Sequence, residues 1–160
     1  MGWLGLKVAK AFGHKLPAFA SRVEAEAQLF GKRDERLLRV KHLAARSGSV
    51  FTADFTPESL RDLEHWYFTL YETDAFGSLG VSREEFERCM ATYFCEVAVR
   101  NSPGAKWVVR EYAFERGKYE VGVQRGLIYL MRSRFTDHYK QLNNKRHQKI
   151  YREYKQHFIT

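Results

Sequence analysis

The sequence predicts an α+β fold: N-terminal helices, then a three-stranded antiparallel meander at about residues 106–132, then a basic C-terminal helix. Two observations lead to this prediction. Apolar residues recur every three or four positions up to about residue 101, which is typical of amphipathic helices. After the break at 102–104, apolar and polar residues alternate instead, and helices followed by a run of strands favour an antiparallel sheet.

The length of the chain favours one domain over residues 1–160. A chain of 160 residues with 44% hydrophobic residues can bury one sizeable core. Within it we distinguish a basic helical region at 1–48, an α+β core at 49–135 and a C-terminal helix at 136–160.

The N-terminal region contains two or three helices. Residues 3–12 place Leu4, Val8 and Ala11 or Phe12 on one face and end at Gly13, and a second helix is predicted over 16–30, ending at Gly31. Residues 36–55 allow two interpretations. A helix followed by a strand is favoured over a hairpin that turns at residues 47–48.

The middle of the chain contains the clearest helix start signals. Thr56 and Pro57 predict a capped helix over 57–72, and Ser82, with Glu85 three residues later, predicts a second over 83–101. We expect both helices to cover one face of the meander. Their predicted core residues are Leu60, Leu63, Tyr67, Leu70 and Tyr71 in the first helix and Phe86, Met90, Tyr93 and Val97 in the second.

The last third of the chain contains the strands. Residues 107–114 and 119–124 alternate around a turn at Arg116-Gly117, and the apolar run at 127–132 suits a third strand. From Thr136 onward, apolar residues at helical spacing lie among many basic ones, which predicts a basic helix.

Charge is distributed unevenly. Basic and acidic side chains number ten and four in residues 1–48, four and ten in 49–100, and 13 and five in 101–160. Two interpretations remain open: oppositely charged segments that pack on each other, or an anionic partner.

Cofactor and metal motifs are absent from the sequence. We find no P-loop, dinucleotide-binding glycine pattern, nucleophile elbow, zinc-type cysteine pairs or HExxH helix, so we expect no cofactor, no metal and no enzymatic activity. Two carboxylates brought together by the fold could still form an acid–base site. Cys89 and Cys95 suit a reduced, buried state, and no secretory signal pattern is seen at the N-terminus; both features predict a cytoplasmic protein.

One candidate site is a group of residues on either side of the break at 102–104. Glu96 and Arg100 lie one helical turn apart at the border of a buried face, and Trp107 follows the break. We expect either a structural seam between helix and sheet or a polar pocket lined by Tyr93, Trp107 and Tyr112.

Two further segments suggest binding. The C-terminal helix offers an anion-binding surface for nucleic acid, with candidate residues Lys140, Lys145, Arg146, Lys149 and Arg152. The first 16 residues resemble a membrane-surface helix in their Trp, Leu and Lys content, but we expect this segment to dock on the protein itself rather than on a membrane.

The segments DFTPESLRDLE and YFCEVAVRNSPGAKWVV resemble uncharacterised bacterial cytosolic proteins, over about residues 50–125. In these relatives a strand leads into an SPESL helix, and a later helix ends in a Gly-Glu-Val-like step before GGKW. This chain has Cys95 where the relatives have glycine, which puts a close backbone contact there in doubt. Some of the relatives resemble immunity-type accessory proteins, which implies protein binding.

From these features we expect a non-catalytic binding or regulatory protein with an unidentified protein partner. The alternative is a nucleic-acid-associated accessory protein that uses its basic ends.

Overall fold

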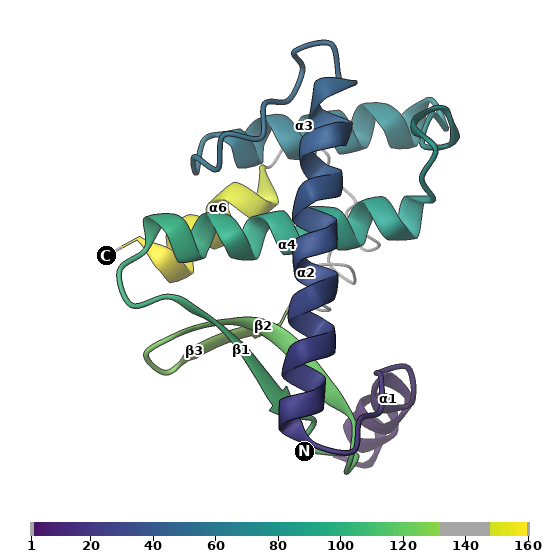
Figure 1. Cartoon of the computed structure of the whole chain (residues 1–160), viewed down its shortest axis with the longest axis vertical. Coiled ribbons are helices and arrows are strands. Elements are labelled where there is room, and N and C mark those ends of the chain that lie inside the picture. The colour runs from purple at the N-terminus through teal and green to yellow at the C-terminus, as the bar shows by residue number, and fades with distance from the viewer. Residues whose placement is uncertain (1, 132–147, 160) are drawn as a thin grey trace.

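The computed structural model describes residues 2–131 and 148–159, which form five α-helices, one short 3-10 helix and one sheet (Figure 1). The predicted α+β class is confirmed, including the N-terminal helices, the antiparallel meander and a C-terminal helix. The elements are α1 (Trp3–His14), α2 (Arg22–Ala45), α3 (Ser59–Glu72), η1 (Gly77–Leu79), α4 (Arg83–Asn101), β1 (Lys106–Glu111), β2 (Tyr119–Arg125), β3 (Ile128–Met131) and α6 (Lys149–Phe158).

The sheet has the strand order β1-β2-β3, and both strand pairs are antiparallel. Trp107 lies opposite Val123, which lies opposite Leu130 on the third strand. Gly117 (φ 80°) and Gly126 (φ 56°) lie in the two turns, where the left-handed backbone favours glycine. The meander therefore forms where the alternating pattern predicts it.

Helix α2 joins the two ends of the molecule. It has 24 residues, which corresponds to a length of about 36 Å, and it lies across both α4 and the sheet (Figure 1). Helix α3 lies on the far side of α4 from the sheet, and α6 packs against α3 and α4 (Figure 1). The expectation that residues 57–72 cover the sheet is therefore wrong, because α2 takes that position together with α4.

The predicted helix end at Gly31 is also wrong. Helix α2 continues through this position because one exposed glycine costs a helix only about 1 kcal/mol, and buried Leu29 and Val40 anchor it on either side. The helix begins at Arg22 rather than at residue 16. The Ser21 side chain accepts the Glu24 N–H at 3.2 Å, and the preceding residues pair with the hairpin through an Ala18–Lys118 bridge.

Residues 36–55 form a helix up to Ala45 and then an irregular segment. Gly48 and Ser49 both adopt a left-handed backbone (φ 63° and 68°), and no strand follows in residues 50–58. The favoured helix is therefore confirmed up to Ala45, whereas the strand expected after it, which the resemblance also implies, and the alternative hairpin are absent from this described segment. The chain instead buries Phe51 and Phe55 against the helices.

Helix α4 begins at its predicted cap, Ser82, whereas α3 begins two residues later than predicted, after Glu58, whose side chain makes no capping bond. Thr56 Oγ1 accepts the Ser59 N–H at 3.3 Å, and Ser82 Oγ accepts the Glu85 N–H at 3.1 Å. The predicted core residues of both helices are buried except Tyr71, which is 50% exposed. Tyr71 lies near the end of α3, where its ring packs on Tyr67 and lies 5.6 Å from the Arg83 guanidinium at the start of α4.

Helix α1 differs most from its prediction. Leu4 and Val8 lie on the expected apolar face, but they are 73% and 66% exposed. The helix contacts the rest of the protein through its C-terminal half instead, where Gly13 is buried and the Phe12 ring packs edge-on against Tyr112.

Candidate functional site

Helix α4 holds three of the predicted site residues on one side. Tyr93, Glu96 and Arg100 are spaced by three and four residues, so their side chains point in similar directions. Trp107 comes from the start of β1, after the turn at 102–105. This side of α4 therefore faces both the irregular segment 50–58 and the sheet.

The Glu96 carboxylate connects α4 to β1. Its Oε1 accepts Arg100 Nε at 2.9 Å, and its Oε2 accepts the indole N–H of Trp107 at 2.7 Å. The Glu96 side chain is 14% exposed and that of Arg100 is 48% exposed. The bond to Trp107 is thus the more protected of the two interactions.

Tyr93 and Arg100 contact Phe55, whose backbone has an unusual conformation. Phe55 has φ 60°, a left-handed geometry that costs a bulky residue on the order of 1–3 kcal/mol. Its N–H donates to Tyr93 Oη at 2.9 Å, and its carbonyl accepts Asn101 Nδ2 at 2.7 Å. The Arg100 guanidinium lies 3.7 Å from the centre of the Phe55 ring. Helix α4 therefore holds this segment on both its polar and its aromatic sides.

Tyr112, the fifth predicted residue, lies elsewhere. Its hydroxyl donates to the Ala9 carbonyl of α1 at 3.0 Å, and its ring packs on Phe12. Tyr112 directly follows β1 and lies five positions after Trp107, and along an extended chain an odd offset directs two side chains to opposite faces. The structure brings Tyr93, Glu96, Arg100 and Trp107 together through contacts between elements, and these contacts already engage their polar groups.

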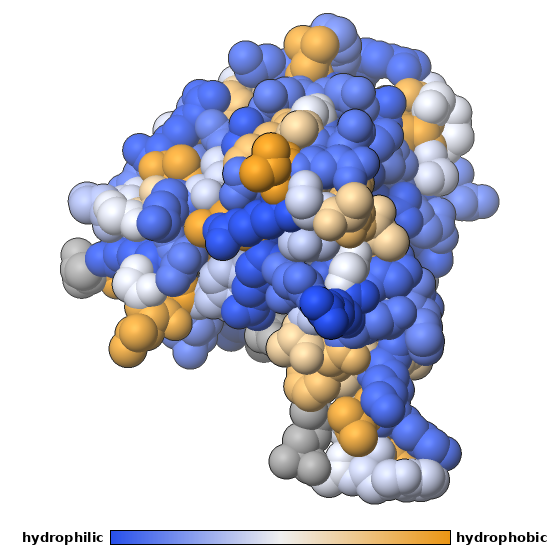
Figure 2. All heavy atoms as spheres, turned by 60° about the horizontal axis from the view of Figure 1, so that its bottom comes forward, coloured by the Kyte–Doolittle hydropathy of each residue, from blue (hydrophilic) through white to orange (hydrophobic). Residues whose placement is uncertain are grey.

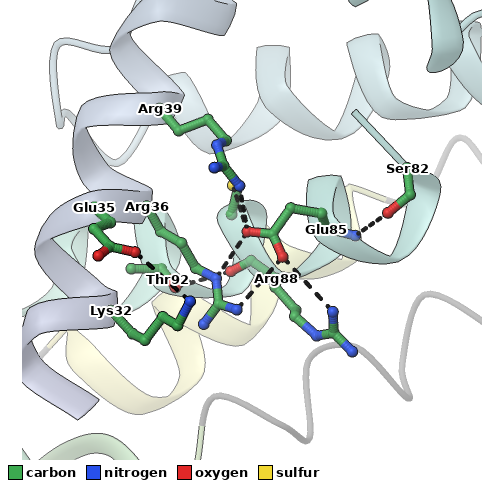
Figure 3. A network of polar contacts seen from close by, with 9 residues as sticks. Lys32, Glu35, Arg36, Arg39, Ser82, Glu85, Arg88 and Thr92 are labelled. Carbon is green, nitrogen blue, oxygen red and sulfur yellow. Dashed lines mark hydrogen bonds and ion pairs between the residues drawn. The ribbon is translucent and has the colours of Figure 1, made fainter. Parts of the chain in front are cut away.

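A second polar cluster lies where α2 crosses α4. Figure 3 shows the guanidinium groups of Arg36, Arg39 and Arg88 pointing toward the carboxylate of Glu85. Arg36 Nε and Nη2 donate to the two carboxylate oxygens at 3.0 and 3.4 Å, and Arg39 Nη1 donates at 2.9 Å. Arg88 Nη1 lies 3.6 Å from Oε2. We call Arg36, Arg39, Glu85 and Arg88 the arginine cluster.

The charges of the arginine cluster do not balance. Burial alone raises the pKa of the Glu85 carboxyl, but the hydrogen bond and charge of Arg36, with the charges of Arg39 and Arg88, outweigh burial and hold this pKa below its usual value. Three positive groups share one negative group, so a formal charge of +2 remains. The side chains of Arg39 and Arg88 are 50% and 51% exposed, whereas that of Arg36 is 11% exposed.

The arginine cluster also bears on the uneven charge of the chain. Arg36 and Arg39 belong to the basic first third, and Glu85 belongs to the acidic middle. Packing between oppositely charged segments therefore does occur here. The sequence by itself indicates only a capping role for Glu85, because its arginine partners on α2 are 46 and 49 residues away.

A surface depression of about 660 Å³ lies along α3. Within it, Glu64 is 2% exposed, and its Oε1 accepts the backbone N–H groups of Lys149 and Ile150 at 3.1 and 3.4 Å. Burial raises the pKa of Glu64, although these hydrogen bonds and the charges of Arg152 and Lys149 act against the rise. The described residues that line the depression are Arg61, Glu64, His65, Phe68, Thr69, Glu72 and Gln148.

The chemistry of this depression is limited by what its groups already do. The buried carboxylate serves as the cap of α6, because the residue that precedes this helix, Gln148, makes no side-chain capping bond. Arg61, His65 and Glu72 are exposed. Among the described residues, the lining is an open surface whose buried carboxylate, that of Glu64, already accepts two backbone N–H groups of α6.

The predicted anion-binding residues fall in two groups. Lys140, Lys145 and Arg146 lie outside the described residues, whereas Lys149 and Arg152 lie in the first turn of α6. Arg152 is exposed, and both cations lie near enough to Glu64 to influence its pKa. Among residues 2–131 and 148–159, no three His, Cys, Asp or Glu side chains lie close enough together to hold a metal ion. The helices of these same residues include none with the length and hydropathy needed to cross a membrane.

Comparison with known proteins places the chain in a family. The uncharacterized protein YwmA of Bacillus subtilis (strain 168) is 28% identical over 116 residues, which cover 72% of this chain and 73% of that protein. No solved structure matches. The family model described as uncharacterised protein YwmA matches residues 18–158, a longer span than the expected resemblance, and leaves α1 outside. The chain therefore belongs to the YwmA family of uncharacterised proteins.

Proposed function

We propose that the protein is a non-catalytic binding protein whose arginine cluster binds an acidic segment of a partner protein. The observation that carries this proposal is that three guanidinium groups share one carboxylate. Arg36 makes a two-pronged, largely buried bond that fixes α2 on α4. Arg39 and Arg88 are half exposed, and each contacts Glu85 through a single nitrogen.

The exposed guanidinium groups suit a carboxylate from a partner. Each group presents five N–H donors in a planar fork that matches a carboxylate, and Glu85 uses only part of them. The positive field that remains would attract an acidic segment and would orient it during association. The immunity-type role implied by the resemblance would be one form of such binding, with an acidic rather than a basic target.

Exposed acidic side chains near the cluster favour a short acidic segment over nucleic acid. Glu35 and Glu84 are 67% and 53% exposed, and each is next in sequence to a cluster residue, Arg36 or Glu85. Figure 3 shows Glu35 on the same helix as Arg36 and Arg39. A nucleic-acid backbone carries charge continuously and would meet these carboxylates. The nucleic-acid alternative retains support from α6, where Arg152 and Lys155 are exposed and Tyr151 is partly exposed.

The test is a pair of matched double variants. Arg39→Gln with Arg88→Gln removes the exposed half of the cluster, whereas Arg22→Gln with Arg110→Gln removes the same charge from two other partly exposed ion pairs. Binding of a fluorescently labelled oligo-glutamate peptide is measured by anisotropy, with a single-stranded oligonucleotide as the second probe. Partner proteins are then captured from bacterial lysate with each variant and identified by mass spectrometry.

We expect the cluster variant to lose at least tenfold in peptide affinity, since two charged contacts of about 1 kcal/mol each would be removed. The control variant should bind as the wild type does. Equal binding by the two variants would contradict the proposal, and binding of the oligonucleotide alone would favour the alternative.

A further inference from the structure

Helix α1 exposes several large apolar side chains that the rest of the protein does not cover. Trp3 is 70% exposed, Leu4 73%, Val8 66% and Leu6 36%. Leu4, Val8 and Ala11 follow one another at helical spacing, so they form a continuous stripe along the helix. Figure 2, in which the end of the molecule that carries α1 comes forward, shows apolar side chains at this surface.

Helix α1 is attached to the protein by a different face. Ala9 accepts the Tyr112 hydroxyl through its carbonyl, and a Cβ atom added to Gly13 would lie 2.9 Å from the Tyr112 ring. His14 Nδ1 lies 3.3 Å from Glu115. These contacts fix the C-terminal half of the helix and leave the stripe uncovered. The YwmA family match begins at residue 18, so α1 is an addition to the part of the chain that this match defines.

The charge of this segment has one sign only. The first 23 residues contain Lys7, Lys10, Lys15 and Arg22 and no acidic side chain. The Lys7 ammonium lies 3.8 Å from the centre of the Trp3 ring, which places a cation beside an exposed aromatic side chain. A second copy of the chain would bring these lysines against each other, whereas an anionic surface would neutralise them.

We propose that α1 docks on an anionic lipid surface, with Leu4 and Val8 entering the boundary of the acyl chains and Lys7 and Lys10 facing the headgroups. A short helix that combines an apolar stripe with lysines lies in the plane of such an interface. Tryptophan prefers this boundary because its ring is apolar and its N–H is polar, which suits Trp3. This surface is separate from the arginine cluster, so either proposal can fail without the other.

The experiment measures co-sedimentation of the full chain with vesicles. Phosphatidylcholine vesicles that contain phosphatidylglycerol are compared with vesicles of phosphatidylcholine alone. Leu4→Ser with Val8→Ser is the test variant. The matched control is Val23→Ser with Leu38→Ser, because these α2 residues are also apolar and exposed, at 78% and 55%.

We expect binding to the anionic vesicles, a drop of about tenfold or more in the partition coefficient of the test variant, and no change in the control. Lys7→Gln and Lys10→Gln should each lower the partition coefficient on anionic vesicles about fivefold, and added salt should also lower it. Emission of Trp3 should shift to the blue on binding, and Trp3→Phe should abolish that shift, since Trp66 is already buried and Trp107 is partly buried with its N–H bonded to Glu96.

Three outcomes would overturn the proposal. The first is an absence of sedimentation with anionic vesicles. The second is equal sedimentation of the test and control variants, which would assign the binding to another basic region. The third is a dimer in solution, seen by light scattering, that dissociates only in the test variant, because the stripe would then belong to a second copy of the chain.

Discussion

The bond between Trp107 and Glu96 allows a direct test of how the sheet is held on α4. The perturbation is a double-mutant cycle that combines Glu96→Ala with Trp107→Phe. The phenylalanine keeps most of the ring in place and removes the indole N–H that donates to Glu96 Oε2 at 2.7 Å. A second cycle, Glu96→Ala with Arg100→Gln, removes the ion pair that lies one turn away on α4.

The structure predicts different coupling energies for the two cycles. A hydrogen bond to a charged acceptor contributes about 1.5–3 kcal/mol when protected from water. Glu96 is 14% exposed and Trp107 is partly buried, so we expect a coupling near the lower limit, about 1.5 kcal/mol. The Arg100 side chain is 48% exposed, and an ion pair of this kind contributes about 0.3–0.5 kcal/mol.

Urea unfolding of the wild type, the single variants and the double variants gives both coupling energies. Changes in ring volume cancel within the first cycle, because both of its Trp107→Phe arms contain them. A coupling below about 0.5 kcal/mol for Glu96 with Trp107 would refute the reasoning. A coupling energy that is larger for Glu96 with Arg100 than for Glu96 with Trp107 would also refute it, since solvent exposure would then not determine which interaction is stronger.

Three further predictions concern single positions. Burial raises the pKa of Glu64, so the folded state binds this proton more tightly than the unfolded state does and loses stability as pH rises from 4.5 through the native pKa. Glu64→Gln should therefore gain stability relative to wild type over that pH range, as measured by urea unfolding. A stability difference that stays constant with pH would contradict this. Burial raises the pKa of the Cys89 thiol to about 12, and Cys95 is also buried, so neither should react with a thiol reagent until urea unfolds the protein; rapid labelling of the native protein would contradict their burial. Gly31→Ala should stabilise by about 1 kcal/mol in thermal unfolding, because an added Cβ meets nothing within 4 Å, and destabilisation would indicate a constraint at this position.

Local signals in the sequence predicted the elements well. Ser82 marks the start of α4, and the change from helical to alternating spacing marks β1, because capping and periodicity involve residues that are near in sequence. The error at Gly31 has a related cause. A helix-ending signal competes with burial on either side of it, and sequence alone does not reveal that α2 is anchored by Leu29 and Val40.

The candidate sites were harder to predict, because partners distant in sequence define them. Glu96, Arg100 and Trp107 lie within 12 residues of one another, so a local pattern was enough to bring these contacting residues into one candidate site. Glu64 caps a helix 85 residues later, and no local pattern indicates such a partner. The exposure of α1 was missed for a similar reason, because an apolar stripe predicts a contact without saying whether the protein itself provides it.

Helix α6 depends on other helices at both of its ends. Its first N–H groups donate to Glu64 of α3, and the carbonyl of Phe158 accepts the Ser102 hydroxyl, which follows α4, at 2.7 Å. A ten-residue helix with no cap of its own is marginal in isolation. The order of folding should therefore be fixed, with α6 forming only after α3 and α4 have taken their places. Hydrogen exchange in this helix would then report on the integrity of the whole helical layer, and mutations in α6 should mainly speed unfolding rather than slow folding.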